Sequence, residues 1–142
     1  MKFVAIVPTY NRSIILGKTI HSILSRKNIK GVILVVQSSD PLERKRYRKI
    51  IQKLKGMYDK DIVDIWSDKP LGSAKARKIA LEKALQLFSD DHVVMMLEDD
   101  FILPSDERIF EYITHDFNIS YRIACIIAVS YTHLTLPTTE RV

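Results

Sequence analysis

Three consecutive acids, Glu98, Asp99 and Asp100, follow an apolar run from Val93 to Leu97. The run has the length and composition of a buried strand, so the three carboxylates should stand at its carboxyl end. Adjacent like charges repel one another, and burial raises the pKa of a carboxyl group, so such a cluster is stabilised by a shared cation. The triplet is therefore a candidate metal site, and the alternative is a solvated acidic turn that caps the next helix.

The spacing of the acids favours two of them as metal ligands. Side chains in an extended segment alternate in direction, so Glu98 and Asp100 are predicted to point one way and Asp99 the other. Mg²⁺ and Mn²⁺ accept a few carboxylate oxygens, keep several waters and leave positions open for phosphate oxygens. An acid-x-acid pair with this geometry could hold either ion.

The elements that position these acids alternate between apolar strands and amphipathic helices. Unbroken apolar runs are typical of strands that are buried on both faces of a parallel sheet. We expect an α/β domain with a mainly parallel sheet and helices on both faces. The expected strands are residues 3–7, 32–36, 62–66, 93–97 and 123–129, and the expected helices are residues 13–27, 41–56, 73–88 and one that starts at Pro104 and Ser105.

Loops at the carboxyl ends of parallel strands line the ligand crevice of an open sheet. Pro8, Thr9 and Tyr10 follow the first strand and are therefore placed to contact a ligand. After the second strand, Asp40 precedes a proline and stands three residues before Glu43, which predicts a helix N-cap with a capping-box acid.

A loop that contains Gly72 leads into the helix predicted at residues 73–88. With Ser73 near its N-cap, the amino terminus of this helix favours anions, and Lys75 and Arg77 add positive charge that a diphosphate would need. Arg77 is predicted to contact the ligand. Lys75 and Lys78 are explained as well by the solubility of an exposed helix.

The net charge of the 142-residue chain is +5, and much of the basic excess lies in the helix 41–56. A solvated helix face is the first interpretation, and contact with an anionic membrane surface is the second. No nucleic-acid motif accompanies this segment, so we expect no nucleic-acid partner. A single cysteine, Cys125, excludes an intrachain disulfide, and no apolar run approaches 18 residues. The expected location is the cytoplasm, with contact at the inner face of the membrane through residues 41–56.

Two stretches carry a resemblance to a known family. Residues 93–104, V-V-M-M-L-E-D-D-F-I-L-P, resemble the DxD region of GT-A glycosyltransferases in its E-D-D variant. Residues 3–12, F-V-A-I-V-P-T-Y-N-R, resemble the opening strand of family 2 glycosyltransferases. The resemblance covers residues 1 to about 129 and implies a Rossmann-like GT-A domain at residues 1–130. It also implies transfer of a sugar, with inversion, from a nucleotide diphosphate sugar such as a UDP-sugar or GDP-sugar to an acceptor hydroxyl.

The resemblance assigns roles to individual residues. It implies that Mn²⁺ or Mg²⁺ is held by Asp100, with Glu98 as a direct or water-mediated ligand, and that Asp99 orients the loop or contacts the ribose or the sugar. By the same resemblance, the residues that bind the nucleotide are Pro8, Thr9, Tyr10 and Arg77. Many members have an Asp at the end of the second strand, whereas this chain has Val36 and Gln37 there, with Ser38 or Asp40 as candidate substitutes. The identity of the base stays open.

The tail at residues 131–142 is rich in Thr and does not resemble the family's continuation. We therefore expect a non-native tail and a truncated domain that lacks the acceptor half and its general base, so no base is named. Two alternatives stay open, a non-catalytic nucleotide-sugar-binding fragment and a nucleotidyltransferase-like enzyme. The second would need a Gly-rich loop after the first strand, and residues 8–11 contain no glycine.

Overall fold

The computed structural model describes residues 2–89, 91–106 and 108–119, in which strands and helices alternate along the chain. The predicted strand at residues 123–129, Cys125 within it and the atypical tail lie outside the described residues. In chain order the elements are β1 (Lys2–Tyr10), α1 (Ser13–Leu24), β2 (Ile29–Gln37), α2 (Pro41–Met57), β3 (Asp61–Ser67), α3 (Ser73–Leu87), β4 (His92–Met96) and α4 (Arg108–Ile119).

The strands form one parallel sheet with the order β3-β2-β1-β4. In this order β1 lies at the centre of the sheet, and Ile6 is in register with Ile33 of β2 and Met96 of β4. The chain proceeds outward from β1 through β2 to β3 and then returns to place β4 on the other side of β1. The sheet therefore changes direction between β1 and β4, which is where open α/β sheets bind ligands, outside the carboxyl ends of the strands.

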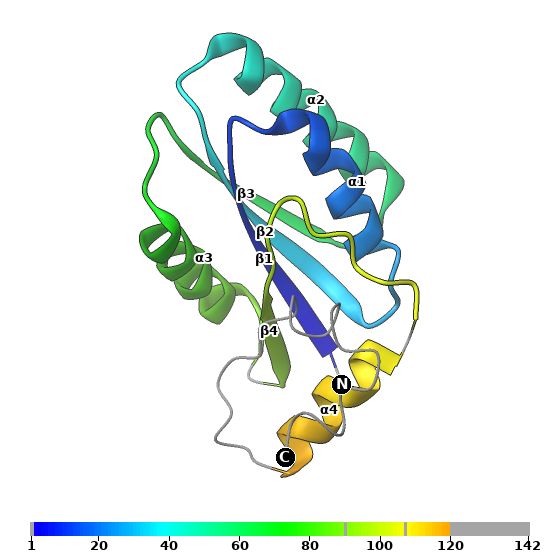
Figure 1. The fold of residues 1–142 in the computed structure, drawn as a ribbon. Coiled ribbons are helices and arrows are strands. Elements are labelled where there is room, and N and C mark those ends of the chain that lie inside the picture. The colour runs from blue at the N-terminus through cyan, green and yellow to red at the C-terminus, as the bar shows by residue number, and fades with distance from the viewer. Residues whose placement is uncertain (1, 90, 107, 120–142) are drawn as a thin grey trace.

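Helices cover both faces of the sheet, as predicted. Helices α1 and α2 lie on one face and α3 lies on the other (Figure 1). Strand β1 is buried on both sides, because Phe3, Ala5 and Val7 pack in the cluster under α1 and α2 while Val4 and Ile6 pack against α3. An unbroken apolar run is the pattern that this environment requires.

The amino terminus of α2 confirms one predicted contact and corrects another. The Asp40 carboxylate accepts a hydrogen bond from the Leu42 N–H at 3.0 Å, with proline at the first helical position, so Asp40 is the N-cap. Glu43 does not complete a capping box. Its carboxylate accepts hydrogen bonds from the N–H and the hydroxyl of Ser13, at 3.3 and 2.5 Å, and so ties the start of α1 to the start of α2.

Helix α4 begins later than predicted, at Arg108 rather than at Pro104 and Ser105. The Asp106 carboxylate accepts a hydrogen bond from the Arg108 N–H at 2.9 Å and so serves the start of the helix. The preceding segment is used to cover the sheet, because Phe101 and Leu103 are buried in the core under α1. Ile109 and Phe110 of α4 are buried against the same core.

Candidate active site

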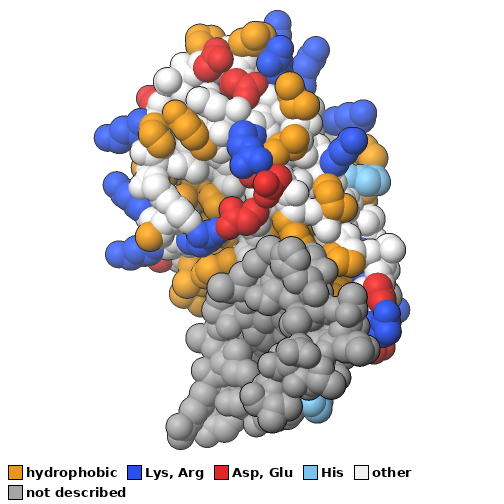
Figure 2. Space-filling model, in the orientation of Figure 1, with side chains coloured by type: hydrophobic (Ala, Val, Ile, Leu, Met, Phe, Trp, Pro, Cys, Tyr) orange, Lys and Arg blue, Asp and Glu red, His pale blue; other side chains and the backbone are white. Residues whose placement is uncertain are grey.

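A cleft of about 320 Å³ opens at the carboxyl ends of β1 and β4, where the sheet changes direction. Acidic and basic side chains lie next to one another at the centre of this face (Figure 2). Ten residues line the cleft, and five of them are predicted site residues: Pro8, Thr9, Tyr10, Glu98 and Asp99. Gly72 and Ser73 belong to the helix terminus that the sequence predicts to favour anions. Arg12, Gln37 and Pro70 were not predicted to contact a ligand.

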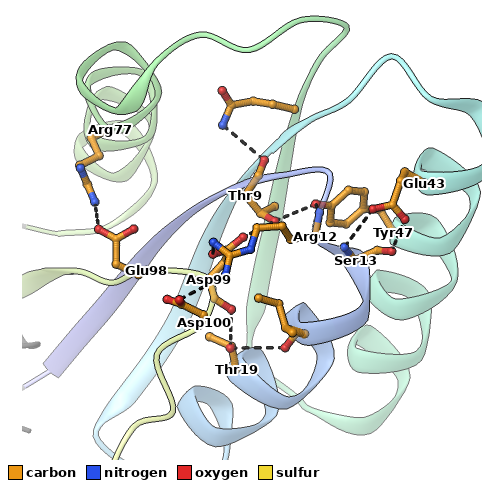
Figure 3. A network of polar contacts seen from close by, with 12 residues as sticks. Thr9, Arg12, Ser13, Thr19, Glu43, Tyr47, Arg77, Glu98, Asp99 and Asp100 are labelled. Carbon is orange, nitrogen blue, oxygen red and sulfur yellow. Dashed lines mark hydrogen bonds and ion pairs between the residues drawn. The ribbon is translucent and has the colours of Figure 1, made fainter.

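A chain of hydrogen bonds connects the acids to three other elements (Figure 3). The Thr9 hydroxyl donates to the Asp99 carboxylate at 2.9 Å. Because that hydroxyl has one proton, the Tyr47 hydroxyl, 2.8 Å away, acts as its donor. The Arg12 N–H in turn donates to the Tyr47 oxygen at 2.8 Å. Strand β1, the start of α1, helix α2 and the acidic loop are thereby held in one arrangement.

Removing the Tyr47 hydroxyl should therefore destabilise the fold. Tyr47 is fully buried, so Tyr47→Phe leaves the Thr9 oxygen without its donor and the Arg12 N–H without its acceptor, while the bond from Thr9 to Asp99 stays. We expect a loss of about 1–2 kcal/mol in the free energy of unfolding, measured by urea denaturation. Tyr58→Phe is the control, because the Tyr58 hydroxyl contacts His21 near the surface. Equal effects of the two substitutions would contradict the network.

Asp99 is the buried member of the acidic triplet, with 6% of its side chain exposed. Burial raises the pKa of Asp99 above its ordinary value, while the hydrogen bond from Thr9 and the charge of Arg12 act in the opposite direction. The Arg12 Nη1 atom lies 3.2 Å from Asp99 Oδ1. The Asp99 carbonyl also accepts a hydrogen bond from the Thr19 hydroxyl of α1 at 2.5 Å. These contacts suit a residue that orients the loop.

Glu98 and Asp100 are the exposed acids, each with 56% of its side chain accessible, whereas Asp99 is buried. The two exposed acids do not point in the same direction, as the sequence had predicted they would. Strand β4 ends at Met96 and residues 99–100 form a turn, so the alternation of an extended chain does not reach Asp100. As a result Glu98 contacts Arg77 of α3, whereas Asp100 lies 3.2 Å from Arg12 Nη2.

Two arginines thus provide the positive charge that three adjacent acids require. Among the residues that the structure describes, no group of three His, Cys, Asp or Glu side chains is arranged to hold a metal ion by itself. The oxygen donors of Asp100 and Glu98 still fit a hard ion of the kind that one or two carboxylates hold while phosphate oxygens and waters complete its shell. Both carboxylates are accessible to solvent, as such an ion needs.

Three predicted site residues do not line the cleft: Ser38, Arg77 and Asp100. Ser38 is fully buried, and its hydroxyl accepts a hydrogen bond from the Asp40 N–H at 3.1 Å, so it supports the start of α2 and is not a direct ligand contact. Arg77 stands directly behind the cleft, because both of its partners, Ser73 and Glu98, line it. Asp100 lies at the rim through its contact with Arg12.

Gln37 occupies the end of β2 and joins two loops of the cleft. Its side-chain nitrogen donates to the Thr9 carbonyl at 3.3 Å, and its side-chain oxygen accepts from the Leu71 N–H at 2.8 Å. In the sequence, Gln37 stands out only as a departure from the family pattern. Its place as a polar residue directly after a buried strand is the feature that could have predicted its role at the site.

Arg12 and Tyr47 were not predicted as site residues. Arg12 follows Asn11, whose positive φ of 49° turns the chain sharply after β1, and only the fold shows that this turn faces the acids. Tyr47 shares the buried side of α2 with Ile51 and Leu54, a spacing that indicates a buried ring but no partner for its hydroxyl.

The amino terminus of α3 lines the same cleft as Glu98 and Asp99 of the β4 loop. Gly72 is the N-cap, with φ 85° and ψ 154°, a conformation that favours glycine. The first turn contains no acidic residue, and no side chain caps it. Gly72 and Ser73 line the cleft, so the positive end of the helix dipole lies at its edge, as predicted for an anion site.

Comparison with known proteins gives the identity of the fold. No curated protein matches the chain. The sequence profile of the family described as Glycosyl transferase family 2 matches residues 4–132, which is most of the chain. The parallel sheet with helices on both faces agrees with the GT-A type that the sequence predicted. This chain therefore belongs to glycosyl transferase family 2.

Proposed function

We propose that the cleft binds a nucleotide diphosphate sugar together with a divalent ion, and that the sugar is transferred with inversion to an acceptor hydroxyl. Membership of the family supports a glycosyltransferase. One observation carries the finer proposal. The acidic loop after β4 and the amino terminus of α3 line one cleft, so carboxylates that could hold a metal ion and a helix terminus that could bind an anion border the same space.

The nucleoside is proposed to lie over the carboxyl end of β1. Pro8, Thr9 and Tyr10 line that part of the cleft, and Tyr10 is 47% exposed and therefore free to pack on a base or ribose. Gln37 lines the cleft at the end of β2, where the family pattern has an acid. Its amide is already bonded to two backbone groups, which supports a role in shaping the base pocket.

The diphosphate is proposed to lie between Asp100 and the start of α3. A Mn²⁺ or Mg²⁺ ion at this site would supply Lewis-acid chemistry that lowers the negative charge on the diphosphate. Asp100 and Glu98 would hold that ion. The N–H groups of the first turn of α3, with Arg77 behind them, would bind the phosphate oxygens. Asp99 holds the loop in place through Thr9 and Thr19.

Inversion requires the acceptor oxygen to attack the anomeric carbon on the side opposite the diphosphate, and a base must take its proton. We assign no residue to this step. Asp99 is a poor candidate, because its carboxylate is buried and bonded to Thr9 and Arg12.

Calorimetric titration with UDP and with GDP tests the proposal, in Mn²⁺ or Mg²⁺ and then in EDTA. We expect clearly tighter binding with metal. Assays for nucleoside diphosphate released from a panel of sugar nucleotides, with and without acceptors, separate an enzyme from a non-catalytic binder. Release of pyrophosphate from a nucleoside triphosphate would instead indicate a nucleotidyltransferase. Equal affinity with and without metal would contradict the metal site.

The exposed face of α2 supports a second partner, an anionic membrane surface. Lys45, Lys49 and Lys53 are exposed at a spacing of four residues and so form one stripe. A groove of about 300 Å³ between α1 and α2 runs beside this stripe and is lined by Gly17, Lys18, His21, Ile50, Lys53, Leu54 and Met57. Apolar surface bordered by lysines suits a peripheral contact with anionic lipid. Within the described ranges, no helix is long and apolar enough to span a bilayer.

Sedimentation with vesicles checks this contact. Binding to vesicles that contain phosphatidylglycerol should exceed binding to pure phosphatidylcholine, and the double substitution Lys49→Glu and Lys53→Glu should lower it more than tenfold, since each basic residue near the surface contributes roughly 1 kcal/mol. The control pair Lys75→Glu and Lys78→Glu changes the charge of α3 equally. If the two double substitutions lowered vesicle binding equally, the net charge of the protein and not the stripe on α2 would determine binding.

A further inference from the structure

Arg12 bridges the two acids that follow Glu98. Its Nη1 atom lies 3.2 Å from Asp99 Oδ1, and its Nη2 atom lies 3.2 Å from Asp100 Oδ2. The backbone of Arg12 is fixed, because its N–H donates to the buried Tyr47 hydroxyl. The side chain is 49% exposed, so the guanidinium can turn in solvent while its backbone stays in place.

We propose that Arg12 is the resident counter-ion of Asp99 and Asp100, and that it exchanges this position for the diphosphate when a divalent ion binds. Metal ion and nucleotide would then bind with positive coupling, because each favours the same position of Arg12. The inference rests on the proposed function, since it concerns the ion and the diphosphate of that site.

Electrostatics gives the reason for the exchange. With Arg12 in place the two carboxylates carry a net charge of about −1, so the pair attracts a divalent ion less strongly than two free carboxylates. An ion at Asp100 also repels the guanidinium. A diphosphate offers the planar guanidinium a second set of anionic oxygens. Arg12 therefore leaves the two carboxylates most easily when the nucleotide is present.

Arg77 differs from Arg12 in the acids that it contacts. It lies on α3 and bonds to Glu98 and Ser73, whereas Arg12 contacts Asp99 and Asp100. The exchange at Asp100 therefore belongs to Arg12. Arg77 remains the proposed phosphate ligand at the start of α3.

Titration of Mn²⁺ alone, by calorimetry or by the paramagnetic relaxation of water protons, tests the proposal on wild-type protein, Arg12→Ala, Arg12→Lys and the control Lys27→Ala. Arg12→Ala should bind Mn²⁺ about threefold to tenfold more tightly than wild type, because the competing cation is gone. Arg12→Lys should restore much of the wild-type affinity. Lys27→Ala removes an exposed charge just before β2, outside the lining of the cleft, and should change the Mn²⁺ affinity little.

Titration of UDP and of GDP with and without Mn²⁺ then measures the coupling. In wild type the ion should tighten nucleotide binding by about fivefold or more, and in Arg12→Ala this factor should shrink. A gain in metal affinity cannot come from partial unfolding, which would weaken the site. Should Arg12→Ala not fold, Arg12→Gln removes the charge and keeps a polar side chain.

The metal-alone titration separates the two proposals. If Arg12→Ala gains Mn²⁺ affinity while no nucleotide binds, the counter-ion role stands and the proposed function fails. If nucleotides bind with metal but Arg12→Ala binds Mn²⁺ no more tightly than Lys27→Ala, the counter-ion role is overturned and the proposed function stands.

Discussion

Replacement of Asp100 by Asn should lower the affinity for UDP or GDP in Mn²⁺ by about tenfold to a hundredfold, since changes in the outer shell of a metal site alone have effects of that size. The Asp100 carboxylate is 56% exposed at the rim of the cleft, so the substitution removes a charged oxygen ligand and disturbs little packing. Glu98→Gln should have a smaller effect, because Glu98 is turned toward Arg77. Calorimetric titration in Mn²⁺ and in EDTA measures the nucleotide affinity of each variant.

The matched control is Asp59→Asn, an exposed acid near the opposite end of the sheet, just before β3 begins. It should leave nucleotide affinity unchanged in both conditions. In EDTA, Asp100→Asn should also resemble wild type, because its proposed effect acts through the ion. A similar loss in EDTA and in Mn²⁺ would show that Asp100 acts without a metal.

Replacement of Arg77 by Ala should weaken UDP or GDP binding by about tenfold to a hundredfold and leave binding of the nucleoside nearly unchanged. The reason is that charge-assisted hydrogen bonds contribute roughly 1.5–3 kcal/mol, and a nucleoside has no phosphate to accept them. Arg77 lies behind Ser73 and Glu98 in the wall of the cleft, so it can reach a phosphate by turning from Glu98.

Lys78→Ala is the control for Arg77, because Lys78 is the next residue of the same helix and is exposed. Its loss should change diphosphate affinity by much less than tenfold. If Arg77→Ala weakened nucleoside and diphosphate binding equally, Arg77 would act by holding Glu98 and the start of α3 in place.

Much of the fold could be predicted because buried parallel strands have a distinctive composition. The unbroken runs of β1 and β2 and the acids after β4 identified the sheet and the edge that carries the site. The rule that carboxyl ends of parallel strands meet at one edge put the loop of Thr9 and the loop of the acids at the same edge, and the structure adds the hydrogen bond between Thr9 and Asp99. The order of the strands was not predicted, because pairing depends on contacts between distant segments.

The polar partners of the site were harder to predict, because spacing identifies a buried face and gives no information on what a polar atom contacts. Tyr47 fits an apolar stripe, yet its hydroxyl joins Thr9 and Arg12. Glu43 has the spacing of a capping box, yet Ser13 of the neighbouring helix binds its carboxylate. In both cases a tertiary contact replaced the local one that the sequence favoured.

A crystal structure of the protein with UDP or GDP and Mn²⁺, recorded with anomalous scattering from manganese, tests the central claim most directly. The proposed site predicts an anomalous peak within coordination distance of Asp100 and of the diphosphate, with the nucleoside over Thr9 and Tyr10 and the Arg12 guanidinium moved from Asp100. A nucleotide bound outside this cleft, or one bound within it with no manganese beside Asp100, would contradict the account.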